Sequence, residues 1–188
     1  ATFGVIISCI IGFTVGTLCF QNKNSASFML GVCDIFQTFP SFVYLIPVMM
    51  LFGITDTSVL IAVIVYATIP ATRYTIEGLR SVPVALHDAA TMSGVTKFQR
   101  LFKIEFPLAF PHMMLGLNQT IVFALFMVII GAFIGTEDLG QYILKALSDK
   151  NGAGIGLTLG LCVAFIGLIF DNLIRTWVDQ RKKHLGIN

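Results

Sequence analysis

Hydrophobic residues run through this chain in five long stretches that carry few charges, with short polar segments between them. At about 1.5 Å per residue, such stretches are about long enough for a helix to cross a hydrocarbon core of ~30 Å. The expected spans are about 1–20, 28–54, 57–75, 108–135 and 152–174. With 56% hydrophobic and 12% charged residues, the chain is too apolar for an ordinary soluble domain. The pattern predicts an all-α, multi-pass integral membrane protein.

The second stretch contains two prolines, Pro40 and Pro47, each of which removes a backbone donor and should break or kink a helix. A broken helix at membrane depth is tolerated where it is buried in protein or lines a cavity. This stretch is therefore the expected path-lining element. Asp34 lies within it, and an intramembrane carboxylate suggests a functional site. A structural role near the membrane surface, at the positive end of the helix dipole, is the preferred reading of Asp34.

A polar, basic segment covers 83–107, between the third and fourth stretches. Pro83 can open a short helix, and Gly94 can end it because glycine adopts the left-handed C-cap conformation without a steric penalty. Thr96 and Gln99 have the spacing of a capping box for a second short helix. The segment is expected to form two short helices at the membrane surface.

The spacing in this segment resembles the EAA loop of ABC-importer permeases, in which Glu-Ala-Ala, Gly, Ile and Pro stand at the same intervals. Asp88 replaces the glutamate of that family and keeps its charge on a shorter side chain. The resemblance implies a type I importer permease core of five spans, methionine-importer-like in fold, with cytoplasmic coupling helices and a single domain over 1–188. The expected ATPase-coupling residues are His87, Asp88, Ala89, Ala90, Gly94, Ile104 and Pro107.

The family implies several partners for such a chain. They are a cytoplasmic ABC ATPase dimer that receives the loop, an extracytoplasmic substrate-binding protein, and a second permease copy, most simply in a homodimer. The lipid bilayer surrounds the chain, and no nucleic acid is expected to bind.

A second segment, from Gln37 to Pro47, resembles the Q-T-x-P-x-F-V-Y-L-x-P sequence of permeases for glycine betaine, choline and related osmoprotectants. Aromatic faces attract quaternary ammonium groups, although these aromatic residues could equally pack the bundle or face lipid. Two amides in the fourth stretch could line the path or, as preferred, bridge helices. The candidate path residues are Gln37, Thr38, Phe39, Pro40, Phe42, Tyr44, Asn118 and Gln119. The alternatives are an amino-acid importer resembling the methionine importers and, less favoured, a secondary transporter.

Charge predicts the orientation of the chain. A cytoplasmic 83–107 loop places ten of the twelve Lys and Arg residues in the cytoplasm, as the positive-inside rule requires. These are Lys23, Arg73, Arg80, Lys97, Arg100, Lys103, Arg175, Arg181, Lys182 and Lys183, against Lys145 and Lys150 outside. An amphipathic segment at 138–149 is expected to lie in the outer interface. We expect a bacterial or archaeal cytoplasmic (inner) membrane, with the C-terminus in the cytoplasm.

The sequence contains no phosphate-binding loop of the form G-x-x-x-x-G-K-[ST], so ATP and Mg are expected on the partner ATPase and no cofactor on this chain. No Ser/His/Asp or Cys/His constellation is apparent, and the chain is not expected to be an enzyme. The four cysteines and three histidines lack metal-ligand spacing. The chain starts with an apolar run and no Met, and we expect a longer N-terminus in the whole protein.

Overall fold

The computed structural model describes residues 2–132, 139–149 and 152–185, nearly all of them in helices. The elements are α1 (Thr2–Phe20), α2 (Lys23–Thr38), α3 (Phe42–Phe52), α4 (Asp56–Arg80), α5 (Val84–Met92), α6 (Lys97–Arg100), the π-helical turn η1 (Leu101–Glu105), α7 (Phe106–Gly131), α8 (Leu139–Ser148) and α9 (Ala153–Leu185). Four helices are long and apolar enough to cross a membrane, or five if the bent pair α2 and α3 is counted as one span. The all-helical membrane fold is thus confirmed.

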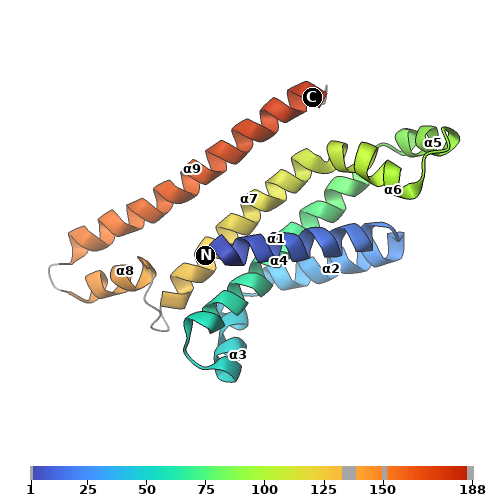
Figure 1. The fold of residues 1–188 in the computed structure, drawn as a ribbon. Coiled ribbons are helices and arrows are strands. Elements are labelled where there is room, and N and C mark those ends of the chain that lie inside the picture. The colour runs from blue at the N-terminus through green and yellow to red at the C-terminus, as the bar shows by residue number, and fades with distance from the viewer. Residues whose placement is uncertain (1, 133–138, 150–151, 186–188) are drawn as a thin grey trace.

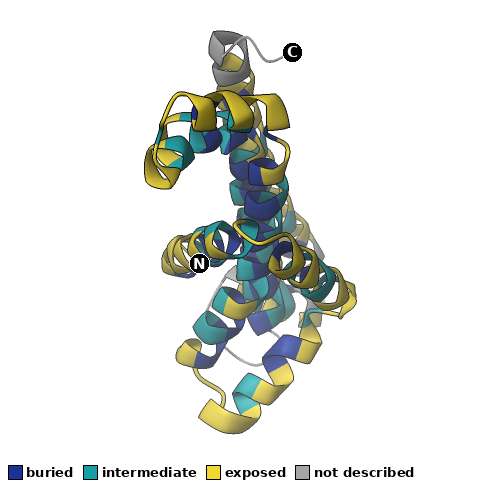
Figure 2. Ribbon diagram, turned by 90° about the vertical axis from the view of Figure 1, so that its right-hand side faces the viewer, coloured by how far each residue is buried: buried dark blue, intermediate teal, exposed yellow. Residues whose placement is uncertain are grey.

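The centre of the bundle is formed by α4 and α7, which cross the molecule side by side (Figure 1). Small residues allow the two helices to approach closely. A Cβ added at Gly116 would lie 2.7 Å from the Cβ of Tyr74, and one at Gly131 would lie 2.8 Å from Val59. Buried residues gather along this central part, and exposed ones lie on the outer helices (Figure 2).

Helix α1 packs along α4 through glycines that the sequence places four residues apart. A Cβ at Gly12 would lie 2.4 Å from the Cβ of Ala71 and 2.9 Å from the backbone nitrogen of Thr72. A Cβ at Gly16 would lie 2.7 Å from the Cβ of Thr75. Small residues spaced in this way let helix backbones touch within a membrane, where lipid removes the usual hydrophobic drive.

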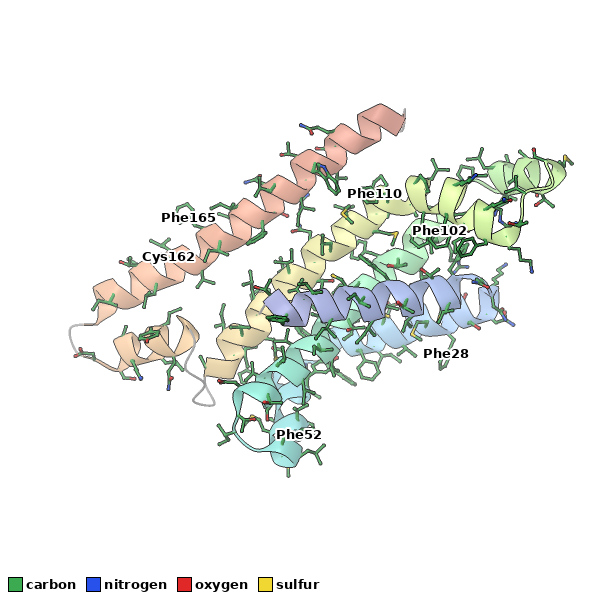
Figure 3. The ribbon with its side chains drawn as sticks, viewed as in Figure 1. Phe28, Phe52, Phe102, Phe110, Cys162 and Phe165 are labelled. Carbon is green, nitrogen blue, oxygen red and sulfur yellow. The ribbon has the colours of Figure 1, made fainter. Side chains whose placement is uncertain are left out.

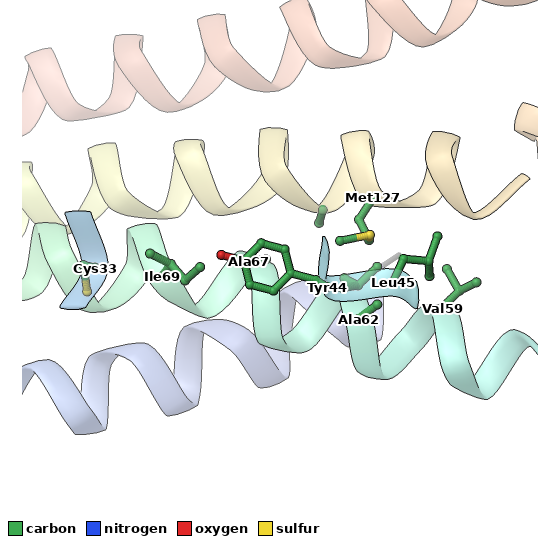
Figure 4. Packing of buried hydrophobic residues seen from close by; sticks show 10 residues of the cluster. Cys33, Tyr44, Leu45, Val59, Ala62, Ala67, Ile69 and Met127 are labelled. Carbon is green, nitrogen blue, oxygen red and sulfur yellow. The ribbon is translucent and has the colours of Figure 1, made fainter. Parts of the chain in front are cut away.

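The second expected span is two helices, and it begins at Lys23. Helices α2 and α3 meet at an angle of 87° across a break at Pro40. The expected break at Pro47 is not found, because Pro47 lies inside α3 and the helix continues past it. One missing donor is tolerated where neighbouring helices pack around the site. Figure 4 shows Tyr44 and Leu45 of α3 beside Met127 of α7, in the largest buried cluster.

The other expected spans shift at their ends. Helix α4 continues to Arg80, and α9 runs from Ala153 to Leu185. The second short helix expected in the 83–107 loop is not separate, since α6 continues through η1 into α7 as one helical span from Lys97 to Gly131. No left-handed residue interrupts it there, and the helix continues past Pro107, which follows just after the π-helical turn.

Helix α9 lies along α7 on the outer side of the bundle, and Phe165 points away from α7 (Figure 3). Phe110 of α7 meets Trp177 of α9, with ring centroids 5.2 Å apart. Within the segment expected to be an interfacial helix, 138–149, the structure has the helix α8, and residues 133–138 lie outside the described part of the chain.

The two ends of the bundle differ in charge. Helix α5, the end of α4, the start of α2 and the C-terminal end of α9 lie on the right-hand side of Figure 1, and α3 and α8 lie toward the other side. The right-hand end therefore holds the basic positions on which the predicted orientation depends, among them Lys23, Arg80, Lys97 and Lys103.

Candidate functional site

Helix α5 projects from the basic end of the bundle and has well-defined ends. Pro83 stands at its N-cap, and Ser93 at its C-cap. Gly94 follows with a φ of 70°, and its amide donates to the carbonyl of Thr91 while the amide of Val95 donates to that of Ala90. These two bonds form a Schellman motif, the helix stop that the sequence predicts at Gly94. A Cβ at Gly94 would meet nothing within 4 Å, so backbone conformation, and not crowding, requires glycine here.

The predicted capping box at the start of α6 is also present. The amide of Gln99 donates to Oγ1 of Thr96 at 3.3 Å, and the amide of Thr96 donates to Oε1 of Gln99 at 3.1 Å. The helix then widens into η1. Such π-helical turns are uncommon and often mark functional sites.

A buried carboxylate joins α5 to this turn. Glu105 is 2% exposed; its Oε1 accepts from Nε of Arg100 at 2.9 Å and lies 3.1 Å from Nδ1 of His87. His87 belongs to α5, Arg100 to α6, and Glu105 ends η1 immediately before α7. We call this group the Glu105 clasp. A buried carboxylate without partners would be strongly disfavoured. The clasp therefore holds α5 against the segment that leads into the start of α7.

The clasp borders a cavity of about 460 Å³ at the basic end of the molecule. Its lining residues come from the end of α1, from α5, and from α6 with η1: Phe20, Gln21, His87, Lys97, Phe98, Arg100, Leu101 and Glu105. Because two of these side chains carry positive charge and the one carboxylate is already paired, the cavity is lined by more positive than negative charge.

The predicted coupling residues lie together at this end, but they face different ways. Asp88 and Ala89 are exposed on α5, which leaves them accessible to another chain. Ala90 is buried, and His87 is turned into the clasp. Ile104 lies half-buried in η1 and Pro107 half-buried in the first turn of α7.

The predicted path residues fall into two groups, and only part of the first is exposed. Thr38, Phe39, Pro40 and Phe42 are exposed around the break between α2 and α3. Gln37 is half-buried, and its Oε1 accepts from Nη1 of Arg73 on α4 at 2.8 Å. Together they line one side of the α2–α3 corner.

Tyr44 differs from its neighbours because it is buried in the core. Its hydroxyl donates to the carbonyl of Phe36, and its ring lies 5.0 Å from that of Tyr66, which in turn stacks on Phe123 at 4.6 Å. The expectation that Tyr44 lines an open path does not fit this conformation. Its role is to hold the broken helix against α4 and α7.

Asn118 and Gln119 lie in the middle of α7. Asn118 is 2% exposed, and its Nδ2 donates to Oδ1 of Asp171 on α9, whose carboxylate also accepts from Nε of Arg175 at 2.9 Å. Asn118 thus bridges two helices, as preferred from the sequence. Gln119 is half-buried beside it.

Two important residues were not recognised from the sequence. Glu105 was not distinguished from other loop charges, although its position between Ile104 and Phe106 is a signal for burial. Arg73 was counted only among the basic residues expected in the cytoplasm. It instead pairs with Asp34, with Nη1 2.6 Å from Oδ1, and with Glu77, with Nε 2.9 Å from Oε1.

A transport permease subunit is the class of protein that fits these membrane helices, the projecting α5 and the basic end of the bundle. The chain belongs to the binding-protein-dependent transport system inner membrane component family, whose pattern matches residues 4–184. Members of this family are membrane components of transporters, so the chain is a membrane permease component.

Particular relatives make the comparison more specific. The chain is 91% identical over 187 residues to the trimethylamine N-oxide transport system permease protein TmoV of Pelagibacter ubique, covering 100% of this chain and 26% of that protein. It is 32% identical over 182 residues to the glycine betaine transport system permease protein OpuAB of Bacillus subtilis, covering 97% and 64%. The chain spans about a quarter of the length of the TmoV relative.

The fold is similar to that of a solved structure of the MetNI methionine ABC transporter in an inward-facing conformation. The TM-score is 0.82 at 18% identity, over 95% of this chain and 89% of that one. At this identity the similarity shows a shared fold, which confirms the methionine-importer-like architecture expected from the sequence.

Proposed function

We propose that this chain forms the membrane path of an ATP-driven importer for small methylated amines, with trimethylamine N-oxide as the first candidate cargo. The observation that carries the proposal is the 91% identity over the whole chain to a trimethylamine N-oxide permease. Substitutions at fewer than one position in ten leave little room for a different path.

The proposed energy source is a separate cytoplasmic ABC ATPase dimer that binds ATP and Mg. Helix α5 supports this assignment because it projects from the basic end with Asp88 and Ala89 exposed. The Glu105 clasp joins α5 to α7, so a displacement of α5 by the ATPase would be passed to a membrane-spanning helix. The two arrangements of the spans are then the inward-facing and outward-facing states, and nucleotide supplies the difference in binding energy.

The proposed path lies between two permease copies, and an extracytoplasmic binding protein delivers the cargo. Exposed polar side chains at the α2–α3 corner support the pairing. Asp34 has a 58% exposed side chain within a helix of the bent pair, and a carboxylate there is costly against lipid. A second copy or a water-filled path would cover it. The proposed location is a bacterial inner membrane, with α5 and the C-terminus on the cytoplasmic side.

Glycine betaine and choline remain the second candidates for cargo. The Gln37–Pro47 segment and the 32% identity to a glycine betaine permease favour them. Trimethylamine N-oxide shares their trimethylated nitrogen, so one path could serve this chemical class. The likeness to the methionine transporter concerns the fold alone and gives methionine no support.

The test is uptake by the reconstituted transporter. The full-length permease is purified with its ATPase and binding protein, placed in vesicles, and given labelled trimethylamine N-oxide, glycine betaine, choline or methionine with internal or external ATP as the orientation requires. We expect ATP-dependent uptake of trimethylamine N-oxide. Uptake of methionine alone, or uptake that needs no ATP, would contradict the proposal.

A further inference from the structure

Arg73 is the centre of the largest set of charged and polar contacts between the membrane helices of the described chain. Its Nη1 lies 2.6 Å from Oδ1 of Asp34 and donates to Oε1 of Gln37 at 2.8 Å, and its Nε donates to Oε1 of Glu77 at 2.9 Å. Asp34 and Gln37 belong to α2, and Glu77 lies one turn further along α4. The guanidinium group thus connects the broken helix to the central one.

This cluster lies within helices that are candidate membrane spans, where charge disfavours contact with lipid. Arg73 lies seven residues before the end of α4, roughly 10 Å from the basic end of that helix, inside the candidate span. The side chains of Asp34 and Arg73 are 58% and 31% exposed. Charged groups at this depth face protein or water because their transfer to hydrocarbon costs several kcal/mol.

The exposed pair has a defined chemical polarity. The Asp34 carboxylate presents negative charge, and the Arg73 guanidinium beside it presents positive charge with N–H donors at Nη2, which takes no part in the three bonds above. Phe36 and Phe39 lie on the same helix end, both about 40% exposed, with ring centroids 5.8 Å apart. Aromatic faces of this kind attract methylated cationic nitrogen.

We propose that Asp34 and Arg73 form a contact site for cargo inside the transport path, selective for methylated amines that carry both a positive nitrogen and a negative oxygen. This inference rests on the proposed function. The carboxylate of Asp34 contacts the trimethylated nitrogen, and Arg73 donates hydrogen bonds to the oxygen of the N-oxide or carboxylate. The rings of Phe36 and Phe39 stand on another face of the same helix end.

The ion pair between Asp34 and Arg73, which forms when no cargo is bound, also explains how cargo can pass without being trapped. When cargo binds, Asp34 and Arg73 separate. Asp34 then pairs with the positive nitrogen of the cargo and Arg73 with its negative oxygen, so little charge is left unpaired at any step. When cargo leaves, the 2.6 Å pair forms again. A transport site works in this way when binding is favourable enough for entry and weak enough for release.

The test uses two variants that each remove one carboxylate from Arg73. Asp34→Asn removes the carboxylate proposed to contact cargo, and Glu77→Gln removes the one on the same helix as Arg73. In either variant Arg73 keeps the other carboxylate, so neither leaves it without a counter-charge. Both are measured in the full-length reconstituted transporter with the cargo that the wild type takes up, alongside the ATP hydrolysis stimulated by loaded binding protein.

We expect Asp34→Asn to lower uptake by about ten-fold while stimulated ATP hydrolysis stays within about two-fold of the wild type. Glu77→Gln should keep most of the uptake, and Asp34→Glu, which restores the charge, should recover uptake in part. Equal uptake by Asp34→Asn and Glu77→Gln, or a parallel loss of uptake and ATP hydrolysis, would overturn the inference and leave the proposed function in place. Absence of methylated-amine uptake by the wild type would overturn both.

Discussion

The Glu105 clasp leads to a prediction about the mobility of α5. Glu105→Gln keeps the size of the side chain and one acceptor oxygen but removes its charge. The carboxylate accepts from Arg100 at 2.9 Å and lies 3.1 Å from Nδ1 of His87, while only 2% exposed. The contact with His87 is the one that joins α5 to Glu105, and a polar contact to a charged group contributes about 1.5–3 kcal/mol, so we expect α5 to lose about 2 kcal/mol of its attachment. That loss raises the detached fraction of α5 about 30-fold.

Hydrogen exchange measures this fraction. A helix as short as α5 is not stable alone in water, so its amides exchange when it detaches. We expect the amides of 84–92 to exchange about 30-fold faster in Glu105→Gln, with α4 and α7 unchanged. Lys103→Gln is the matched control, since it removes an exposed charge from the same turn. It should leave the exchange of α5 as in the wild type.

A double-mutant cycle tests the reasoning further. His87→Ala removes the contribution of α5 to the clasp and leaves the pair between Arg100 and Glu105. If the clasp holds α5, adding Glu105→Gln to His87→Ala should loosen α5 little more than either change alone. Additive effects, or unchanged protection of α5 in Glu105→Gln, would refute the clasp as its attachment.

Three further predictions concern the backbone and the packing of helices. Gly94→Ala should destabilise the turn after α5 by about 1–2 kcal/mol, because alanine is strained at this positive φ. We expect faster hydrogen exchange in the turn and weaker coupling of ATP hydrolysis to uptake, and coupling equal to that of the wild type would count against this prediction. Gly12→Val should lower the free energy of unfolding of the permease by about 1–3 kcal/mol, because the added Cβ would overlap Ala71. Gly31→Ala, whose Cβ would meet nothing within 4 Å, should not lower it, and equal stabilities of the two variants would be inconsistent with the α1–α4 contact. Pro40→Ala should slow solute passage more than ATPase binding, and an unchanged transport rate would argue against a path role for the α2–α3 corner.

The sequence predicted the elements that depend on local chemistry. The stop at Gly94 and the capping box at Thr96 follow from backbone preferences within a few residues, and both are found as expected. The break at Pro40 is local in the same sense. Span lengths were harder to assign, because the apolar pattern fades at Arg73 while α4 continues to Arg80.

The contacts between distant residues could not be read from the sequence. The pairing of Arg73 with Asp34 joins positions 39 residues apart, and Asn118 meets Asp171 across 53 residues. Tyr44 is a further example. Its place in an uncommon motif predicted a residue of the transport path, but in the structure it packs against Tyr66 and is buried. Periodicity gives the face of a helix, but the partner of that face depends on the whole bundle.

The most direct test concerns the side of the membrane on which α5 lies and whether the partner ATPase covers it. Met92 is 90% exposed at the end of α5, and Met92→Cys in a full-length protein from which all other cysteines are removed, among them Cys9, Cys19, Cys33 and Cys162, provides a single thiol. A membrane-impermeant maleimide should label it only from the cytoplasmic face, and bound ATPase should block the labelling. Labelling from the outer face, or cytoplasmic labelling that the ATPase leaves unchanged, would contradict a cytoplasmic coupling helix.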